Sequence, residues 1–175
     1  PEYIVPHIER NEGNVKPLIN HPSVIVWRLG NECGYGVNFE KAYDWVKACD
    51  TTRPAQYERG GYDSKTDIYC PMYIGYEESE NYCKSNGTKP YIQCEYAHAM
   101  GNSEGGFKEY WDLIRKYPIL QGGFDWDFVD QGLHRKVLKP MTIKNPEKMS
   151  NEELRKIEYC YGGDYNNYDP SDNNF

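Results

Sequence analysis

Apolar residues gather in five short runs along the chain, and polar segments with glycine, proline or helix-capping residues separate these runs. The first run, Ser23–Glu32, is mostly apolar and rich in β-branched residues, which is typical of a strand buried on both faces. The runs predict strands over Ser23–Glu32, Pro54–Glu58, Asp67–Tyr73, Lys89–His98 and Leu120–Gln131.

Amphipathic helices are predicted between some of these strands. Asn38 can cap a helix in which apolar residues recur at helical spacing from Phe39 to Val46. Ser103 can cap a second helix, which Pro118 closes. Strands and helices that alternate in this way indicate parallel βα units, whose functional residues lie at the C-terminal ends of the strands. Five strands predict either a smaller open α/β fold or a βα barrel whose first part is missing.

The segment 132–158 differs from the rest of the chain. It is rich in lysine and has no clear strand periodicity, although Ser150 and Glu153 can form the capping box of a short helix. We interpret this segment as an insertion at the surface, after the last strand.

Composition and charge argue against several classes of protein. The net charge of −7 over 175 residues, with both signs interspersed, argues against a nucleic-acid-binding surface. No apolar run is long enough to span a membrane. The six cysteines are scattered without a C-x-x-C pair, which argues against a zinc site and favours reduced thiols in the core. Together with the lack of a visible signal peptide, they favour a cytoplasmic location.

Two glutamates of interest lie at or near the C-terminal ends of predicted strands. Glu32 is followed by Gly34 and Gly36, and Glu95 stands near the end of Lys89–His98. A single glutamate in such a place is commonly a solvent-facing or capping carboxylate. Two carboxylates at the mouth of a barrel suit glycoside hydrolysis, because one protonates the leaving oxygen and the other attacks the anomeric carbon or activates water.

The sequence around both glutamates resembles the family 2 glycoside hydrolases, and within them the large β-galactosidases. The stretches "HPSVIVWRLGNE" and "CEYAHAMGNS" carry the resemblance, and the second is the more specific of the two. The resemblance continues in the same order through "TTRPAQYE", "TDIYCPMY", "YPILQGGFDWDFVDQ" and "YGGDY". It covers most of residues 20–165 and is interrupted at 76–88 and 132–158.

The resemblance implies a fold, an activity and partners. The expected fold is a TIM (β/α)8 barrel, of which residues 1–175 would supply about strands 4 to 8 of the catalytic domain of a larger β-galactosidase. The expected activity is retaining hydrolysis of terminal β-D-galactosides, with transfer of the sugar to other hydroxyls as a side reaction. Because five strands would leave edges unpaired, we expect association with the rest of a longer chain or with copies of itself, and little activity alone.

The resemblance also implies the role of each site residue. Glu32 corresponds to the general acid/base, and Glu95 to the nucleophile. Tyr73 is the expected hydrogen-bond donor to Glu95, and Asn31 the expected ligand of the sugar 2-hydroxyl. His98 corresponds to a ligand of a galactose hydroxyl.

The resemblance further implies an apolar platform for the sugar and two metal sites. Trp126 is expected to form an apolar platform beneath the sugar. The family's magnesium site would include Glu32, with its other ligands in residues that precede this segment. Phe175 would contribute its backbone carbonyl to a sodium site.

Two alternatives remain at this stage. The chain could be a noncatalytic carbohydrate-binding or scaffold protein, although the presence of both glutamates argues against this reading. It could also have another family 2 specificity, such as that of a β-glucuronidase.

Overall fold

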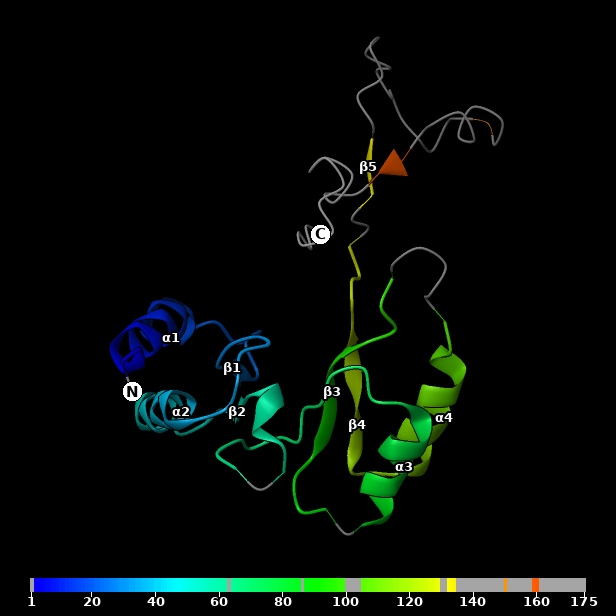
Figure 1. The fold of residues 1–175 in the computed structure, drawn as a ribbon, viewed down its shortest axis with the longest axis horizontal. Coiled ribbons are helices and arrows are strands. Elements are labelled where there is room, and N and C mark those ends of the chain that lie inside the picture. Colours follow the sequence, from blue (N-terminus) through cyan, green and yellow to red (C-terminus); the bar gives the residue numbers. More distant parts are fainter. Residues whose placement is uncertain are drawn as a thin grey trace. The chain divides into compact units, whose positions relative to one another are not determined.

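The computed structural model describes residues 2–62, 64–85, 87–99, 105–129, 132–134, 150 and 159–160 (Figure 1). The chain divides into two compact units, Pro1–Trp126 and Asp127–Phe175. No helix among the described residues has both the length and the apolar character needed to cross a membrane.

The described residues of the first unit form four α-helices and four strands in the order α1-β1-α2-β2-α3-β3-α4-β4, with a short 3-10 helix, Glu58–Gly60, after β2. The helices are α1 (Ile4–Leu18), α2 (Val37–Cys49), α3 (Tyr76–Lys84) and α4 (Phe107–Lys116). The strands are β1 (Trp27–Arg28), β2 (Ala55–Gln56), β3 (Tyr91–Tyr96) and β4 (Leu120–Asp125).

All pairing between strands of the first unit is parallel, as the βα pattern predicts. β1 pairs with β2, and β3 pairs with β4. The predicted strand Asp67–Tyr73 forms two parallel bridges to β3, one of which joins Met72 to Glu95. Its Asp67 N–H also donates to the Ala55 carbonyl at 2.8 Å. The five predicted strands therefore lie side by side in sequence order, as successive strands of a barrel do.

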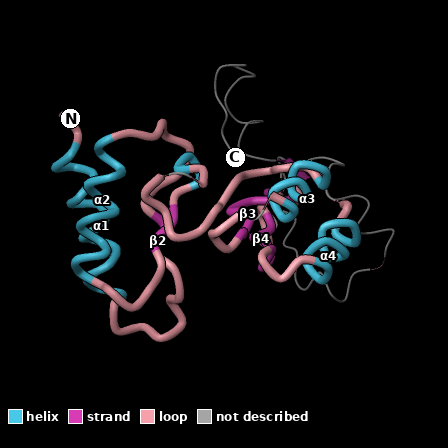
Figure 2. The backbone as a smooth tube through the Cα atoms, turned by 90° about the horizontal axis from the view of Figure 1, so that it is seen from below, coloured by secondary structure: helices cyan, strands magenta, loops and turns pink. Residues whose placement is uncertain are grey.

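The hydrophobic core of the first half is built where α1 and α2 cover β1 and β2. Figure 2 shows α1 and α2 next to each other. Phe39, Ala42 and Val46 of α2 are buried, so the predicted apolar face is the buried one. Burial of the Phe39 and Val46 side chains contributes about 1.5–3 kcal/mol each. The cluster consists of Val15, Trp27, Leu29, Phe39, Val46, Ala55 and Tyr57.

A buried carboxylate joins the end of α2 to β1. Asp50 accepts hydrogen bonds from the Trp27 indole at 2.9 Å and from the Thr52 hydroxyl at 2.6 Å, and its ion pair with Arg53 is 2.7 Å long. The hydrogen bonds from Thr52 and Trp27 hold the pKa of Asp50 well below its usual range. Asp50 therefore stabilises the strand that delivers Glu32.

The predicted helix starts need correction. α2 begins at Val37 after Gly36, and no side chain caps it, so Asn38 stands inside the helix. Ser103 lies outside the described residues, and α4 begins at Phe107 after Gly106, whose φ is +72°. Glycine suits that position because a φ of this sign costs it little.

Two helices were not predicted. α1 has few apolar residues and buries only Asn11 and Val15. α3 is strongly polar, and its one buried residue, Ser79, forms a 2.7 Å hydrogen bond with the Tyr91 hydroxyl of β3. Neither helix has a wide apolar face, and apolar periodicity is the signal on which the prediction relied.

Five of the six cysteines are free thiols: Cys33, Cys49, Cys70, Cys83 and Cys94. Cys70 and Cys94 are buried, whereas Cys33 and Cys49 are exposed. The prediction of core thiols is therefore wrong for the two exposed ones.

The second unit contains one antiparallel pair of strands within the described residues, β5 (Leu133–His134) and β6 (Tyr159–Cys160). The segment predicted to be an insertion without strands therefore starts with a short strand. The helix predicted from Ser150 and Glu153 falls on residues 151–158, which are outside the described residues.

Candidate functional site

The two predicted catalytic glutamates lie at the same edge of the parallel sheet in the first unit. Glu32 comes four residues after the end of β1, and Glu95 is the fifth residue of β3. Because the strands are parallel, both lie toward the C-terminal edge of the sheet. Glu95 is 6 % exposed, whereas Glu32 is open to solvent. One carboxylate is thus held inside the protein, and the other is accessible.

A hydrogen-bond donor and a cation face the two oxygens of Glu95. The Tyr73 hydroxyl donates to Glu95 Oε2 at 2.8 Å, and Arg28 Nη2 lies 3.5 Å from Glu95 Oε1. Charge-assisted contacts of this kind stabilise an ionised carboxylate and restrict its rotation. The arrangement suits a nucleophile that has to be charged and oriented before it attacks.

Tyr73 connects the two glutamates electrostatically. Burial is the main reason why the pKa of its phenol is raised, followed by the hydrogen bond to Glu95 and then by the negative charges of Glu95 and Glu32. The phenol therefore keeps its proton and acts as a donor. The contribution from Glu32 also means that both carboxylates act on the same hydroxyl group.

The backbone at the site has an unusual conformation. Among the described residues, only three non-glycine residues have a positive φ: Glu32 at +51°, Tyr73 at +51° and Ala97 at +50°. Ala97 immediately precedes His98. Such a conformation is uncommon for side chains larger than glycine and is concentrated at functional sites. Each of these residues lies at or beyond the C-terminal end of a parallel strand segment.

Two of the other predicted ligands, His98 and Asn31, contact residues of this centre. The rings of His98 and Tyr73 meet edge to face, with centroids 5.5 Å apart. Asn31 is exposed, and its Oδ1 accepts a hydrogen bond from Arg28. Trp126 follows β4, and its carbonyl accepts from the Ala99 N–H at 2.6 Å. His98 therefore lies against the ring of Tyr73. Asn31 is linked to Glu95 through Arg28, which contacts both residues.

Two charged residues of the site were missed by the sequence analysis. Glu58 Oε1 accepts a hydrogen bond from the Glu32 N–H at 2.5 Å. Arg28 Nη2 lies 3.7 Å from Glu58 Oε2, in addition to its contact with Glu95. The one sequence signal for Glu58 was that "PAQYE", like the other strands of interest, ends in a carboxylate.

Metal binding has little support from the residues that the structure describes. No group of three histidine, cysteine, aspartate or glutamate side chains is placed among them to hold a metal ion. Glu32 is thus not part of such a group in the described part of the chain, and Phe175 lies outside that part.

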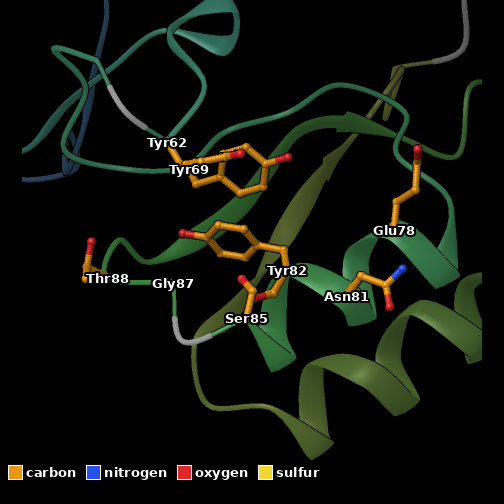
Figure 3. Close-up of a pocket in the computed structure, with 8 residues that line it drawn as sticks. All are labelled: Tyr62, Tyr69, Glu78, Asn81, Tyr82, Ser85, Gly87 and Thr88. Carbon is orange, nitrogen blue, oxygen red and sulfur yellow. The ribbon is translucent and has the colours of Figure 1, made fainter.

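A cavity of about 570 Å³ opens at the other end of the strands (Figure 3). Tyr69 and Tyr82 stack in its wall with ring centroids 4.1 Å apart. Tyr69 pairs with Tyr91, the first residue of β3, so this cavity lies toward the N-terminal ends of the strands. It is lined by Tyr62, Tyr69, Glu78, Asn81, Tyr82, Ser85, Gly87 and Thr88, and none of the predicted site residues is among them.

The sequence matches that of the TIM barrel domain of the glycosyl hydrolases family 2 over residues 1–175. A beta-galactosidase of Leuconostoc mesenteroides is 44 % identical over 190 aligned residues, which cover 100 % of this chain and 17 % of that protein. A beta-galactosidase of Pectobacterium atrosepticum is 42 % identical and is covered to 16 %. The chain therefore spans about one sixth of the length of these curated relatives.

Solved structures of beta-glucuronidases share the fold of this chain. A Ruminococcus gnavus beta-glucuronidase matches 80 % of this chain with a TM-score of 0.60 at 17 % identity, and 31 % of that protein is covered. A Faecalibacterium prausnitzii beta-glucuronidase matches 71 % of this chain with a TM-score of 0.53 at 18 % identity, and 28 % of that protein is covered. At these identities the likeness concerns the fold alone.

Proposed function

Because the chain belongs to glycoside hydrolase family 2, within its TIM barrel domain, we propose that it carries the two catalytic carboxylates of a retaining β-galactosidase. The observation that carries the proposal is the environment of Glu95, which has the Tyr73 hydroxyl on one oxygen and Arg28 near the other. The identity of 41–44 % to beta-galactosidases favours galactosides over glucuronides as substrates.

In the first step, the ionised carboxylate of Glu95 attacks the anomeric carbon while Glu32 protonates the departing oxygen. A covalent glycosyl ester of Glu95 forms, and the aglycone leaves with the proton from Glu32. In the second step, Glu32, now ionised, removes a proton from water, and that water displaces Glu95 from the sugar. A sugar hydroxyl in place of water would give transglycosylation.

The neighbouring side chains have proposed roles in binding. Asn31 would contact the 2-hydroxyl, where hydrogen bonds strengthen in the transition state. His98 would bind another sugar hydroxyl, and Trp126 would present its apolar face to the ring. Magnesium at Glu32 and sodium at Phe175 are proposals from the resemblance alone.

The chain's short length relative to its relatives leads to a proposal about its partners. Since it spans 16–17 % of the beta-galactosidases it matches, we infer that it functions within a longer chain that completes the barrel and the sugar pocket. A cytoplasmic location remains a prediction from the cysteine pattern. Because the sugar pocket would be complete only in that longer chain, the activity experiments below use the longer enzyme.

The test of the proposed function is covalent trapping in the longer enzyme. A 2-fluoro galactosyl inactivator forms a stable ester with the nucleophile, and peptide mass mapping then locates the label. We expect the label on Glu95 and its loss in Glu95→Gln. A label on another residue would refute the nucleophile assignment. Faster turnover of nitrophenyl glucuronide than of nitrophenyl galactoside would refute the specificity.

A further inference from the structure

We infer that Glu58 is a positioning residue that holds the acid/base Glu32 and the cation Arg28 in their working arrangement. The inference rests on the proposed function, because it takes Glu32 as the proton donor to the leaving group. Glu58 itself lies outside the reaction steps given above. It would act through the backbone of one catalytic residue and through the cation that faces the other.

Burial makes Glu58 unusual among the carboxylates of this chain. It is the first residue of the short helix Glu58–Gly60 that follows β2, and 2 % of its side chain is exposed. Removing a carboxylate from water costs several kcal/mol unless charges and hydrogen bonds compensate it. A carboxylate kept in this position therefore needs a partner, and the two partners that it has both belong to the site.

The first partner is the backbone of Glu32. Glu58 Oε1 accepts from the Glu32 N–H at 2.5 Å, across 26 positions of the sequence. Glu32 has a φ of +51°, a conformation that an unrestrained glutamate rarely adopts. The hydrogen bond offsets this backbone strain and thereby determines where the side chain of Glu32 points.

The second partner is Arg28, which Glu58 shares with the nucleophile. Arg28 Nη2 is 3.7 Å from Glu58 Oε2, 3.5 Å from Glu95 Oε1 and hydrogen-bonded to Asn31 Oδ1. Within the described residues, Glu58 Oε2 has no hydrogen bond, so this ion pair is its main compensation. Without the charge of Glu58, the guanidinium is free to move toward Glu95, since the competing anion is gone.

The alternative explanation is a purely structural ion pair, and kinetics can separate the two. A misplaced proton donor slows cleavage of substrates with poor leaving groups, which need the proton. It affects dinitrophenyl galactoside much less, because this leaving group departs without a proton. Loss of folded protein lowers the rates of both substrates by the same factor.

The experiment compares three variants of the longer enzyme with both kinds of substrate. Glu58→Gln keeps an oxygen acceptor for the Glu32 N–H but removes the charge, whereas Glu58→Ala removes both. Asp67→Asn is the matched control, because Asp67 is also a paired carboxylate, which accepts from the Ala55 N–H at 2.8 Å and is bound by Lys47. In the described residues, Asp67 has no contact with either catalytic glutamate.

We expect Glu58→Ala to lower kcat/KM on lactose by about 100-fold, as small misplacements of a catalytic group do, and on dinitrophenyl galactoside by less than about 10-fold. The comparison uses kcat/KM because this constant reports bond cleavage, whereas kcat also includes the second step, in which Glu32 acts as the base for both substrates. Glu58→Gln should lower kcat/KM on lactose by about 10-fold, because it keeps the hydrogen bond and loses the charge. Asp67→Asn should lower Tm and leave the ratio of the two rates unchanged.

Equal losses on both substrates in Glu58→Ala and Glu58→Gln would refute the inference, and so would unchanged rates. Glu58→Gln keeps the test decisive if Glu58→Ala does not fold. Glu32→Gln, measured in parallel, separates the inference from the proposed function. If Glu32→Gln also loses both rates equally, the acid/base assignment fails. If only the Glu58 variants do so, the positioning role fails alone.

Discussion

Replacing Tyr73 by phenylalanine removes the hydroxyl that donates to Glu95 Oε2 at 2.8 Å and leaves the rest of the ring in place. A hydrogen bond to an ionised group contributes about 1.5–3 kcal/mol, and Glu95 is buried, so solvent does not readily replace it. At about 1.4 kcal/mol for each tenfold change in rate, the loss corresponds to about 10- to 100-fold in a step in which Glu95 becomes charged.

The two chemical steps should respond differently to Tyr73→Phe. In the first step, Glu95 gives up its charge as it bonds to the sugar, so the donor matters less as the reaction proceeds. In the second step, Glu95 regains its charge as it leaves the sugar, and the donor stabilises that charge. We therefore expect the variant to accumulate the glycosyl ester, with kcat lowered by about 10- to 100-fold.

The assay is pre-steady-state release of dinitrophenol from dinitrophenyl galactoside by the longer enzyme. A burst equal to the enzyme concentration, followed by slow turnover, is the expected result. Tyr110→Phe is the matched control, because the Tyr110 hydroxyl donates at 3.0 Å to the carbonyl of Ile74, next to Tyr73, and not to a carboxylate. Wild-type turnover without a burst in Tyr73→Phe, or the same burst in Tyr110→Phe, would show that this reasoning is wrong.

Four further predictions concern other contacts of the first unit. Asp50→Ala should lower the free energy of unfolding by about 3 kcal/mol, because it leaves Arg53 and the Trp27 indole without their partner; urea unfolding measures this. Folding lowers the pKa of Asp50, so the contribution of its charge to stability is complete above pH about 4 and is lost as the pH falls further. Asp50→Asn should therefore flatten the acid limb of a profile of Tm against pH. An unchanged acid limb would contradict this prediction. Val46→Ala should cost about 1–3 kcal/mol in the same unfolding measurement, since Val46 is fully buried in the core under α2, and a loss below 0.5 kcal/mol would contradict that packing. Arg28→Lys should lower kcat/KM by about 10-fold or more with Tm nearly unchanged, because a lysine cannot reach Glu58, Glu95 and Asn31 from one rigid group, and wild-type kcat/KM would contradict the shared contact.

The fold was predictable where apolar spacing carries the information. β-Branched runs predict the strands, and the spacing from Phe39 to Val46 predicts the buried face of α2. Apolar spacing does not predict α3, which is anchored by the hydroxyl groups of Ser79 and Tyr91. A polar anchor leaves no apolar period in the sequence, so local pattern cannot reveal such a helix.

The candidate site was predictable only in part. The residue types near the strand ends drew attention to Glu32 and Glu95, and the resemblance implied the contact between Tyr73 and Glu95 that the structure shows. The sequence indicated nothing about Arg28, which stands within an apolar strand, and little about Glu58. The importance of both residues depends on contacts between segments that are distant in the sequence. Glu58 and Glu32, for example, are 26 positions apart.

By itself, then, the sequence determined the order of the parallel strands and the delivery of two carboxylates to their C-terminal ends, because burial and chain direction follow from local periodicity. Only the tertiary structure decided what surrounds each carboxylate. The register of β3 against Asp67–Tyr73 brings the Tyr73 hydroxyl to Glu95, and the turn at Glu32 brings its N–H to Glu58. Contacts of this kind arise between segments distant in sequence, and their geometry is set by how strands pack side by side.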